Sequence, residues 1–327
     1  MTGKRVVVTG AAGFIGSHLC ERLLERGDDV IGIDCFTDYY PRAQKERNLE
    51  GLKGRSGFEF VEGDLTRLDL RDLFSRRTIV YHLAAQAGVR ASWGSEFETY
   101  VSCNIRATQR ILEALKERSD VRLVFASSSS VYGKTTVLPT PEEIILAPNS
   151  PYGATKAHCE HLCALYRENW GLDYAALRYF TVYGPRQRPD MGFHKFLRAI
   201  MSGRPLDVYG DGSQSRDCTY VGDIVEATIQ SGDTRTNSQV FNVGGGSRRS
   251  LRDILEIMQE ITGTRAQIRY TDKERGDVPH THADISRSQS EFGYNPRTPV
   301  EEGLRHEAAW LEQLLRQEES RTEAQAG

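Results

Sequence analysis

The sequence predicts an α/β fold, a doubly wound parallel sheet with a smaller C-terminal substrate-binding lobe. Short runs rich in β-branched residues recur through the first 180 residues, and helical segments with apolar residues three and four positions apart lie between them. Nearly continuous apolar strands that alternate with helices are typical of a parallel sheet covered on both faces. Beyond about residue 180, loops rich in Gly, Pro and Arg separate shorter elements, which indicates a second lobe.

The elements follow in a regular order. Between the strands, amphipathic helices are expected over residues 14–27 and 103–118. We expect a nucleotide-binding domain over residues 1–180, a lobe mainly over 181–318 and a frayed polar tail over 319–327. Strands are expected over residues 5–10, 29–34, 58–64, 79–84, 122–127 and 174–179, and the chain is expected to return to the sheet near 239–246.

Composition excludes several classes of protein. The chain has 327 residues, of which 39% are hydrophobic and 27% charged, as in ordinary globular proteins. A net charge of -3 gives no electrostatic reason to expect nucleic acid or an anionic membrane as a partner. No apolar run approaches the roughly 20 residues that span a bilayer, and the N-terminus enters strand-like sequence at once. A cytoplasmic protein without a secretion signal is therefore expected.

The six cysteines are expected to be reduced thiols, because disulfide frameworks belong to small secreted domains. Two of them, Cys159 and Cys163, lie in "HCEHLC" with His158 and His161. No second ligand pair with zinc-like spacing accompanies them, which favours helix packing over a metal site. We expect no metal.

A glycine-rich turn joins the first strand to the first helix. In "VVVTGAAGFIGSHL", Gly10, Gly13 and Gly16 have the spacing GxxGxxG, with Phe14 and Ile15 between the last two. Such glycines let the backbone turn tightly and approach a pyrophosphate, while the helix N-terminus presents free N–H groups to the phosphates. The turn therefore predicts a Rossmann-type dinucleotide site.

The second strand ends in Asp34, about 20 residues beyond the glycines, where a carboxylate binds the adenosine ribose hydroxyls. The residues after it, "CFTDYY", contain no Arg or Lys, which favours NAD over NADP. Asp64, after the third strand, is a candidate for the adenine edge or, equally, for a turn cap. The rest of the expected cofactor site comprises Leu65, Leu83, Ala84 and Ala85.

"YGATK" places Tyr152 and Lys156 one helical turn apart on the same face. A lysine ammonium beside the phenol is expected to lower the tyrosine pKa from about 10 toward neutrality. Tyr152 then accepts a proton from a sugar hydroxyl while hydride leaves the same carbon for NAD. Ser128, at a strand end upstream, is the expected third catalytic residue.

These motifs resemble the extended short-chain dehydrogenase/reductase family over essentially the whole chain. Within it, "HLAAQAGVRASW", "TVYGPRQRPDMGFHKF" and "YGDGSQSRDCTYVGD" are similar to nucleotide-sugar epimerases, most of all to the bacterial UDP-glucuronate 4-epimerase type. The resemblance implies conversion of UDP-glucuronate to UDP-galacturonate by C4 oxidation with NAD, rotation of the 4-keto sugar and hydride return to the other face.

The stretch "SSSSVYG" distinguishes an epimerase from enzymes that catalyse elimination or decarboxylation. The dehydratases and decarboxylases that the chain also resembles carry Asp or Glu in this turn, whereas this chain has Ser129 and Ser130. Hydroxyl groups cannot supply the carboxylate acid or base that elimination needs, so the turn favours epimerisation. We expect Ser129, Ser130 and Thr181 to hydrogen-bond the substrate carboxylate, with Arg188 adding charge. The alternative for Arg186 and Arg188 is a solvated basic loop.

The resemblance also implies how the rest of the substrate is bound. Arg216 and Arg275 match the diphosphate-binding arginines of the family, and Asp277 is a candidate for the uridine ribose. Gly88, Val89 and Arg90 follow the fourth strand, where sugar and nicotinamide would meet; Arg90 is equally well read as a surface residue.

The family further implies a homodimer through two helices, here roughly 97–118 and 152–169, although core-facing helices have the same pattern. Three other functions stay open: UDP-glucose 4-epimerase, a decarboxylase or dehydratase, and a nucleotide-sensing scaffold without catalysis.

Overall fold

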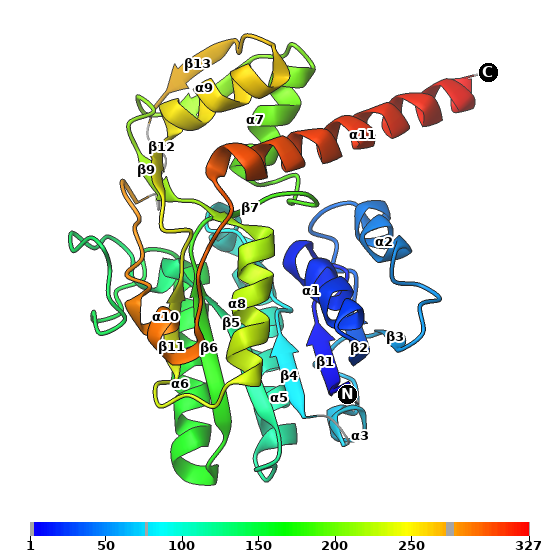
Figure 1. Cartoon of the computed structure of the whole chain (residues 1–327), viewed down its shortest axis with the longest axis vertical. Coiled ribbons are helices and arrows are strands. Elements are labelled where there is room, and N and C mark those ends of the chain that lie inside the picture. Colours follow the sequence, from blue (N-terminus) through cyan, green and yellow to red (C-terminus); the bar gives the residue numbers. More distant parts are fainter. Residues whose placement is uncertain (1–2, 76–77, 273–277, 327) are drawn as a thin grey trace.

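The computed structural model describes residues 3–75, 78–272 and 278–326, and a seven-stranded sheet forms its centre (Figure 1). Every neighbouring pair of strands is parallel, in the order β11-β6-β5-β4-β1-β2-β3. The predicted strands are confirmed, including the late return of the chain. They are β1 (Arg5–Thr9), β2 (Asp29–Asp34), β3 (Phe58–Glu62), β4 (Ile79–His82), β5 (Arg122–Ser128), β6 (Asp173–Tyr179) and β11 (Val240–Val243).

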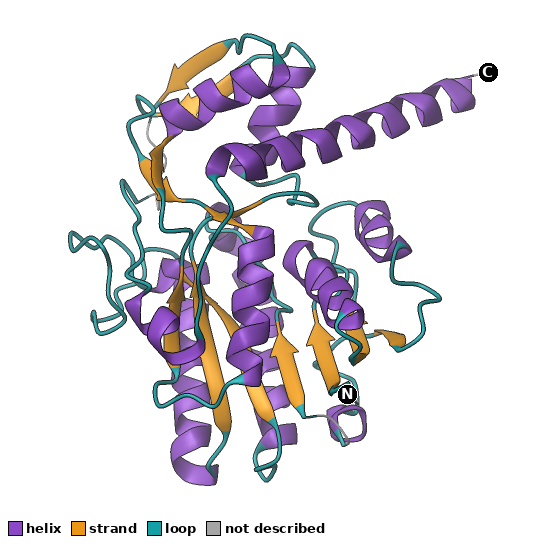
Figure 2. Cartoon of the chain, viewed as in Figure 1, coloured by secondary structure: helices purple, strands orange, loops and turns teal. Residues whose placement is uncertain are grey.

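Helices cover both faces of this sheet (Figure 2). Alternate strand residues point to opposite faces, so Val6 and Val8 join one apolar cluster while Val7 joins the other. The first cluster includes residues of α1 (Phe14–Glu25), α8 (Val221–Asp233) and α10 (Ser286–Phe292). The second includes residues of α3 (Leu70–Phe74), α5 (Ala107–Leu115) and α6 (Pro151–Trp170). The doubly wound fold is thereby confirmed.

A second lobe lies beyond the carboxyl ends of the strands and has its own apolar core. That lobe receives less of the chain after residue 180 than expected, because α8 and α10 belong to the sheet layer together with the expected return at β11. Its elements are β7 (Val182–Tyr183), α7 (Gly192–Met201), β8 (Leu206–Tyr209), β9 (Ser215–Asp217), β10 (Thr219–Tyr220), β12 (Arg248–Ser250), α9 (Leu251–Thr262), β13 (Ile268–Thr271) and α11 (Val300–Ala326).

The prediction of a frayed tail over residues 319–327 is wrong for the part that the structure describes. Helix α11 continues to Ala326 and extends away from the lobe in Figure 1. Its first half is anchored by buried Leu304, Leu311 and Leu314. The last turns are rich in Glu, Arg, Gln and Ala, whose helix propensity continues a helix that packing has already nucleated.

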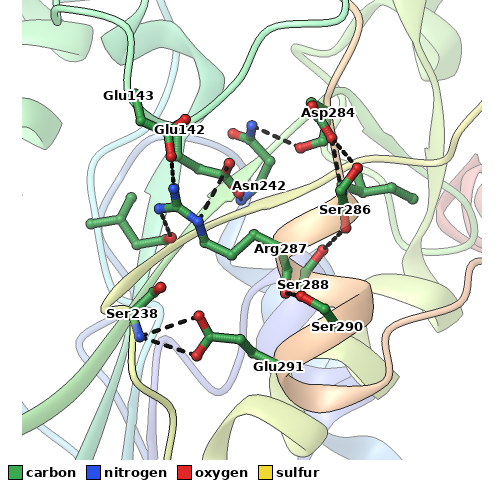
Figure 3. A network of polar contacts seen from close by, with 12 residues as sticks. Glu142, Glu143, Ser238, Asn242, Asp284, Ser286, Arg287, Ser288, Ser290 and Glu291 are labelled. Atoms are coloured by element: carbon green, nitrogen blue, oxygen red, sulfur yellow. Dashed lines mark hydrogen bonds and ion pairs between the residues drawn. The ribbon is translucent and has the colours of Figure 1, made fainter.

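Polar contacts fasten the edge strand β11 to the segment around α10 (Figure 3). Arg287 of α10 donates to the carbonyl of Val240 at 3.2 Å and lies 3.8 Å from the carboxylate of Glu142. The Asn242 amide donates to the carbonyl of Asp284 at 3.0 Å. Late segments of the chain are thus tied to the strand beside β6, close to the end of the sheet that carries the serine stretch.

The strand order reverses between β1 and β4, and ligands of such sheets bind in the crevice outside the carboxyl ends at this point. The glycine turn follows β1 there. Among the described residues, no helix is both long and apolar enough to cross a membrane.

Candidate active site

The turn after β1 has the geometry that a pyrophosphate requires. Gly10 has φ +74, and a Cβ at this residue would lie 2.8 Å from the backbone nitrogen of Ala84. A Cβ on Gly16 would lie 2.1 Å from the carbonyl oxygen of Gly10, so only glycine permits the close approach of helix and turn. Gly13 caps α1 without a side-chain hydrogen bond, and the first turn of the helix faces a cavity. Phosphate oxygens fit these N–H groups.

Asp34 ends β2 at the other side of the same cavity. Its carboxylate accepts hydrogen bonds from the backbone nitrogens of Phe36 at 2.8 Å and Ala12 at 3.1 Å, which ties the second strand to the glycine turn. Burial raises the pKa of Asp34, and these N–H donors together with the charge of Lys45 oppose the rise. A carboxylate oxygen accepts more than one hydrogen bond, so the ribose hydroxyls of NAD fit this residue.

All residues assigned to the cofactor from the sequence line this one cavity. Asp64 lines it and also accepts hydrogen bonds from the nitrogen and hydroxyl of Thr66, both at 2.8 Å, so it makes the contacts of a turn cap. The lining includes Gly10, Gly13, Phe14, Ile15, Gly16, Asp34, Asp64, Leu65, Leu83, Ala84, Ala85, Tyr152 and Lys156.

Helix α6 brings Tyr152 and Lys156 into the cavity. It begins with Ser150 accepting a hydrogen bond from the nitrogen of Gly153 at 3.1 Å, followed by a proline at the first position, and both features favour a helix start. The Lys156 ammonium donates to the carbonyl of Ala126 at 2.7 Å. Burial lowers the pKa of Lys156 to about 8.

The expected effect of Lys156 on the tyrosine is wrong in direction for the protein alone. Burial raises the pKa of Tyr152, and the hydrogen bond from Ser128 and the charge of Arg188 act against that rise. Desolvation of the phenolate outweighs the nearby charges because the ring is enclosed. The lysine ammonium is directed at the backbone of β5 rather than at the phenol oxygen.

A buried polar network begins at Ser127, the first of the four consecutive serines at residues 127–130. The Ser127 hydroxyl donates to Glu160, which pairs with Arg178 at 2.7 Å. Arg178 also donates to the hydroxyl of Tyr132 at 2.8 Å, and that hydroxyl donates to Asn242 at 2.6 Å. Since Asn242 belongs to the network of Figure 3, contacts run from the edge strand to the residue before Ser128.

A second cavity adjoins the first on the side of the smaller lobe. Arg188 lines both cavities, so it lies at their junction. Arg90 also packs over the ring of Tyr209 at 4.3 Å, and Arg216 donates to the carbonyl of Ser215 at 3.0 Å. The predicted substrate residues in the second lining are Gly88, Val89, Arg90, Thr181, Arg188 and Arg216.

The other predicted substrate residues lie elsewhere. Ser128 hydrogen-bonds Tyr152, which lines the first cavity, while Ser129 and Ser130 belong to the short 3₁₀ turn Ser129–Val131 beyond β5. In the part of the chain that the structure describes, these three serines line neither cavity. Arg275 and Asp277 fall outside the described residues.

The interpretation of Arg188 as a solvated basic residue is wrong. Its side chain is 19% exposed and donates two hydrogen bonds to Asp190, both at 2.9 Å. Tyr39, from the loop after β2, donates to the same carboxylate at 3.2 Å. The guanidinium is therefore held between the two lobes.

Helix packing is confirmed for the cysteine pair. Cys159 and Cys163 are buried in the sheet-facing core, whereas His158 and His161 are exposed on the other side of α6. All six cysteines are free thiols.

Sequence reasoning missed several residues of these cavities. Lys45 is buried in the first and donates to the carbonyl of Thr37 at 2.7 Å, although it comes 11 residues after Asp34 and outside the stretch searched for basic residues. Tyr39 lies in "CFTDYY", a stretch whose lack of basic residues favours NAD but which carries no signal for a contact with Asp190. Asp190, two residues after Arg188, gave a signal in the spacing R-P-D.

Comparisons with known proteins agree with this geometry. Residues 6–244 match the sequence model of the NAD dependent epimerase/dehydratase family. An uncharacterized UDP-glucose epimerase of Bacillus subtilis, YtcB, is 43% identical over 96% of this chain and 100% of its own. A UDP-glucuronate 4-epimerase of Thermodesulfobacterium geofontis is 39% identical over 94% of this chain and 96% of its own.

Among solved structures, the UDP-glucuronic acid 4-epimerase of Bacillus cereus in complex with UDP-glucuronic acid and NAD is similar with a TM-score of 0.92 and 41% identity. The match covers 95% of this chain and 99% of that one. With a dinucleotide turn, a YxxxK pair on α6 and this family match over most of its length, the chain belongs to the NAD-dependent epimerase/dehydratase family.

Proposed function

We propose that this protein is an NAD-dependent UDP-glucuronate 4-epimerase, which interconverts UDP-glucuronate and UDP-galacturonate. The observation that carries the proposal is Arg188, an enclosed guanidinium at the junction of the two cavities whose charge reaches Tyr152. An anionic substituent on a sugar bound at this junction meets a cation there. The similarity to the Thermodesulfobacterium and Bacillus cereus enzymes supports the same substrate.

The residues of the chain divide the chemistry among them. NAD bound along the glycine turn and Asp34 supplies the hydride acceptor and donor. Tyr152 removes the proton from the C4 hydroxyl and returns it to the ketone, with Ser128 sharing the hydrogen bond at its phenol oxygen. The positive charge of Arg188 and the hydrogen bond from Ser128 favour the phenolate against the desolvation that raises the pKa of Tyr152.

Epimerisation without loss of carbon dioxide needs a fixed carboxylate. The oxidised uronate is a β-keto acid, which decarboxylates when its carboxylate bond lies perpendicular to the ketone plane. We propose that Thr181 and Arg188 hold the carboxylate out of this geometry, with Ser129 and Ser130 completing the contacts when the sugar enters. No acid stands at the two serine positions to drive elimination.

The rival substrate is a neutral sugar, UDP-glucose, which the name of the Bacillus subtilis relative favours. The reaction would be the same, but the substrate would then bring no carboxylate to Arg188, which would keep its pairing with Asp190 alone. A scaffold without catalysis is disfavoured, since Tyr152 and Lys156 both line the cofactor cavity.

We further propose a cytoplasmic homodimer. Free thiols on all six cysteines fit a reducing compartment. Three large apolar side chains of the two helices expected at the dimer interface are exposed. Phe97 begins α4 (Phe97–Tyr100), the start of the helical segment that leads to α5, and is 45% exposed. Leu165 and Trp170 of α6 are 55% and 48% exposed. A two-fold contact between these helices would cover such side chains.

The test is to incubate the purified protein with UDP-glucuronate, without added NAD, and to identify the products by proton NMR. UDP-galacturonate with little pentose is expected. UDP-xylose or a 4-keto-pentose would overturn the protective role of the carboxylate contacts. If only UDP-glucose were converted, the neutral-sugar alternative would replace the proposal.

A further inference from the structure

The segment that carries Arg188 begins with a tight turn over residues 184–187. The nitrogen of Gln187 donates to the carbonyl of Gly184 at 3.1 Å, Pro185 takes the second position, and Arg186 takes the third with φ +66. This is the pattern of a type II turn, whose third position normally holds glycine because it needs a positive φ. Arg186 therefore occupies a backbone conformation that L residues avoid. Such a conformation persists only where surrounding contacts stabilise it, and here those contacts are made by the Arg186 side chain.

The Arg186 side chain reaches across to helix α1 of the nucleotide-binding domain. Its guanidinium makes two parallel hydrogen bonds to Glu21, at 3.0 Å and 2.7 Å, and a third to the hydroxyl of Ser17 at 3.2 Å. Both partners of the ion pair are largely shielded, with 21% and 23% of their side chains exposed. Paired bonds between guanidinium and carboxylate fix direction as well as distance.

Two further contacts hold the same turn. His18 of α1 bonds through Nε2 to the carbonyl of Pro185 at 2.9 Å, and burial lowers its pKa to about 4, so the neutral ring donates this bond. From the other lobe, the Glu307 carboxyl of α11 accepts a hydrogen bond from the nitrogen of Gly184 at 2.9 Å. The turn is thus attached to α1 on one side and to α11 on the other.

We propose that Arg186 is a positioning residue for the reaction: by pairing with Glu21, it anchors the turn to α1 and so holds Arg188, two residues on, at the junction of the cofactor and substrate cavities. Helix α1 is the helix whose first turn faces the cofactor cavity, so one rigid element locates both the dinucleotide and the cation for the uronate. The inference rests on the proposed function, because it assigns Arg188 to the substrate carboxylate.

The experiment compares Glu21→Gln and Arg186→Gly with wild type. The glycine variant suits the positive φ and removes the contacts of the guanidinium with Glu21 and Ser17, so it separates anchoring from backbone strain. We expect each variant to raise KM for UDP-glucuronate about tenfold and to change kcat/KM for UDP-glucose less than about twofold. Arg186→Lys, which keeps a charge for Glu21, should recover part of the loss. In an Arg188→Ala background, Glu21→Gln should add nothing further.

The matched control is Glu226→Gln, which breaks a neighbouring ion pair of α1, between Arg22 and Glu226 at 2.6 Å, without touching the turn. It should leave KM for UDP-glucuronate and kcat/KM for UDP-glucose unchanged. Hydrogen exchange of the backbone amides of residues 184, 186–188, 190 and 191 gives a readout that needs no substrate: exchange should rise about tenfold in Glu21→Gln and Arg186→Gly but not in the control.

The outcomes distinguish failure of the positioning role from failure of the proposed function. Unchanged exchange in Glu21→Gln, or equal losses with both sugars, overturns the positioning role even if the wild type epimerises UDP-glucuronate. If the wild type does not convert UDP-glucuronate at all, the proposed function fails, and the exchange data alone decide whether Arg186 anchors the turn. Raised exchange with a KM effect confined to the uronate supports both.

Discussion

Replacing Lys156 with methionine is expected to stabilise the fold while it abolishes turnover. The lysine is 3% exposed, and burial lowers its pKa from 10.5 to about 8. At 1.36 kcal/mol for each pKa unit, keeping this ammonium charged at pH 7 costs about 3–4 kcal/mol of folding free energy. Losing the charged hydrogen bond to Ala126 offsets about 2–3 kcal/mol of the gain. A net increase of about 1 kcal/mol is therefore expected.

The pH dependence identifies the cause. Below pH 8 both the folded and the unfolded chain hold the proton, so the cost is fully present in the wild type. Between pH 8 and 10.5 the unfolded chain binds the proton that the folded chain has lost, so wild-type stability rises with pH. The advantage of the methionine variant should shrink over this interval.

Urea denaturation followed by circular dichroism, at pH 7 and pH 9.5, measures both quantities. NAD should be absent in one series and saturating in another, because a ligand of the folded state adds stability of its own. Lys53→Met, at an exposed lysine, is the control and should shift the free energy of unfolding by less than about 0.5 kcal/mol. A Lys156→Met variant that is no more stable than wild type at pH 7, or whose advantage is the same at both pH values, would refute the reasoning.

Three other substitutions test the site. Tyr152→Phe should lower kcat about 10³-fold while calorimetry still detects UDP-glucuronate binding, and a variant with a tenth of wild-type activity would exclude Tyr152 as the acid–base group. Arg188→Ala should raise KM for UDP-glucuronate about 10- to 100-fold, as expected for lost charge-assisted hydrogen bonds, with KM for UDP-glucose within about threefold; equal effects on both would contradict the carboxylate contact. Glu160→Gln leaves Arg178 buried without a carboxylate and should destabilise the fold by about 3–5 kcal/mol in thermal or urea unfolding, whereas a loss under 1 kcal/mol would mean that the pair is not needed.

The sequence allowed the sheet and the cofactor site to be predicted for a simple physical reason. Buried parallel strands are nearly continuous apolar runs, and residues just after them meet at one edge of the sheet. Gly10 and Asp34 are recognisable from local spacing, Leu83 directly follows the fourth strand, and all three line one cavity. Local patterns thus located the parts of the site that the strands themselves position.

Other features depend on contacts between distant segments and left no local signal. Glu21 lies 165 residues from Arg186, and Tyr39 lies 151 residues from Asp190, so neither pair follows from spacing. The pKa of Tyr152 depends on how completely the ring is enclosed, which sequence does not give. The helical tail was missed because its polar residues form no amphipathic pattern of their own and extend a helix anchored upstream.

The most direct test of the central claim uses UDP-glucuronate labelled with deuterium at C4, incubated with the protein in ordinary water. If C4 is oxidised and reduced within one closed site, the UDP-galacturonate formed should carry the deuterium at C4, as NMR or mass spectrometry would show. UDP-galacturonate with hydrogen at C4, or a pentose as the main product, would contradict an epimerase that returns the same hydride and protects the carboxylate.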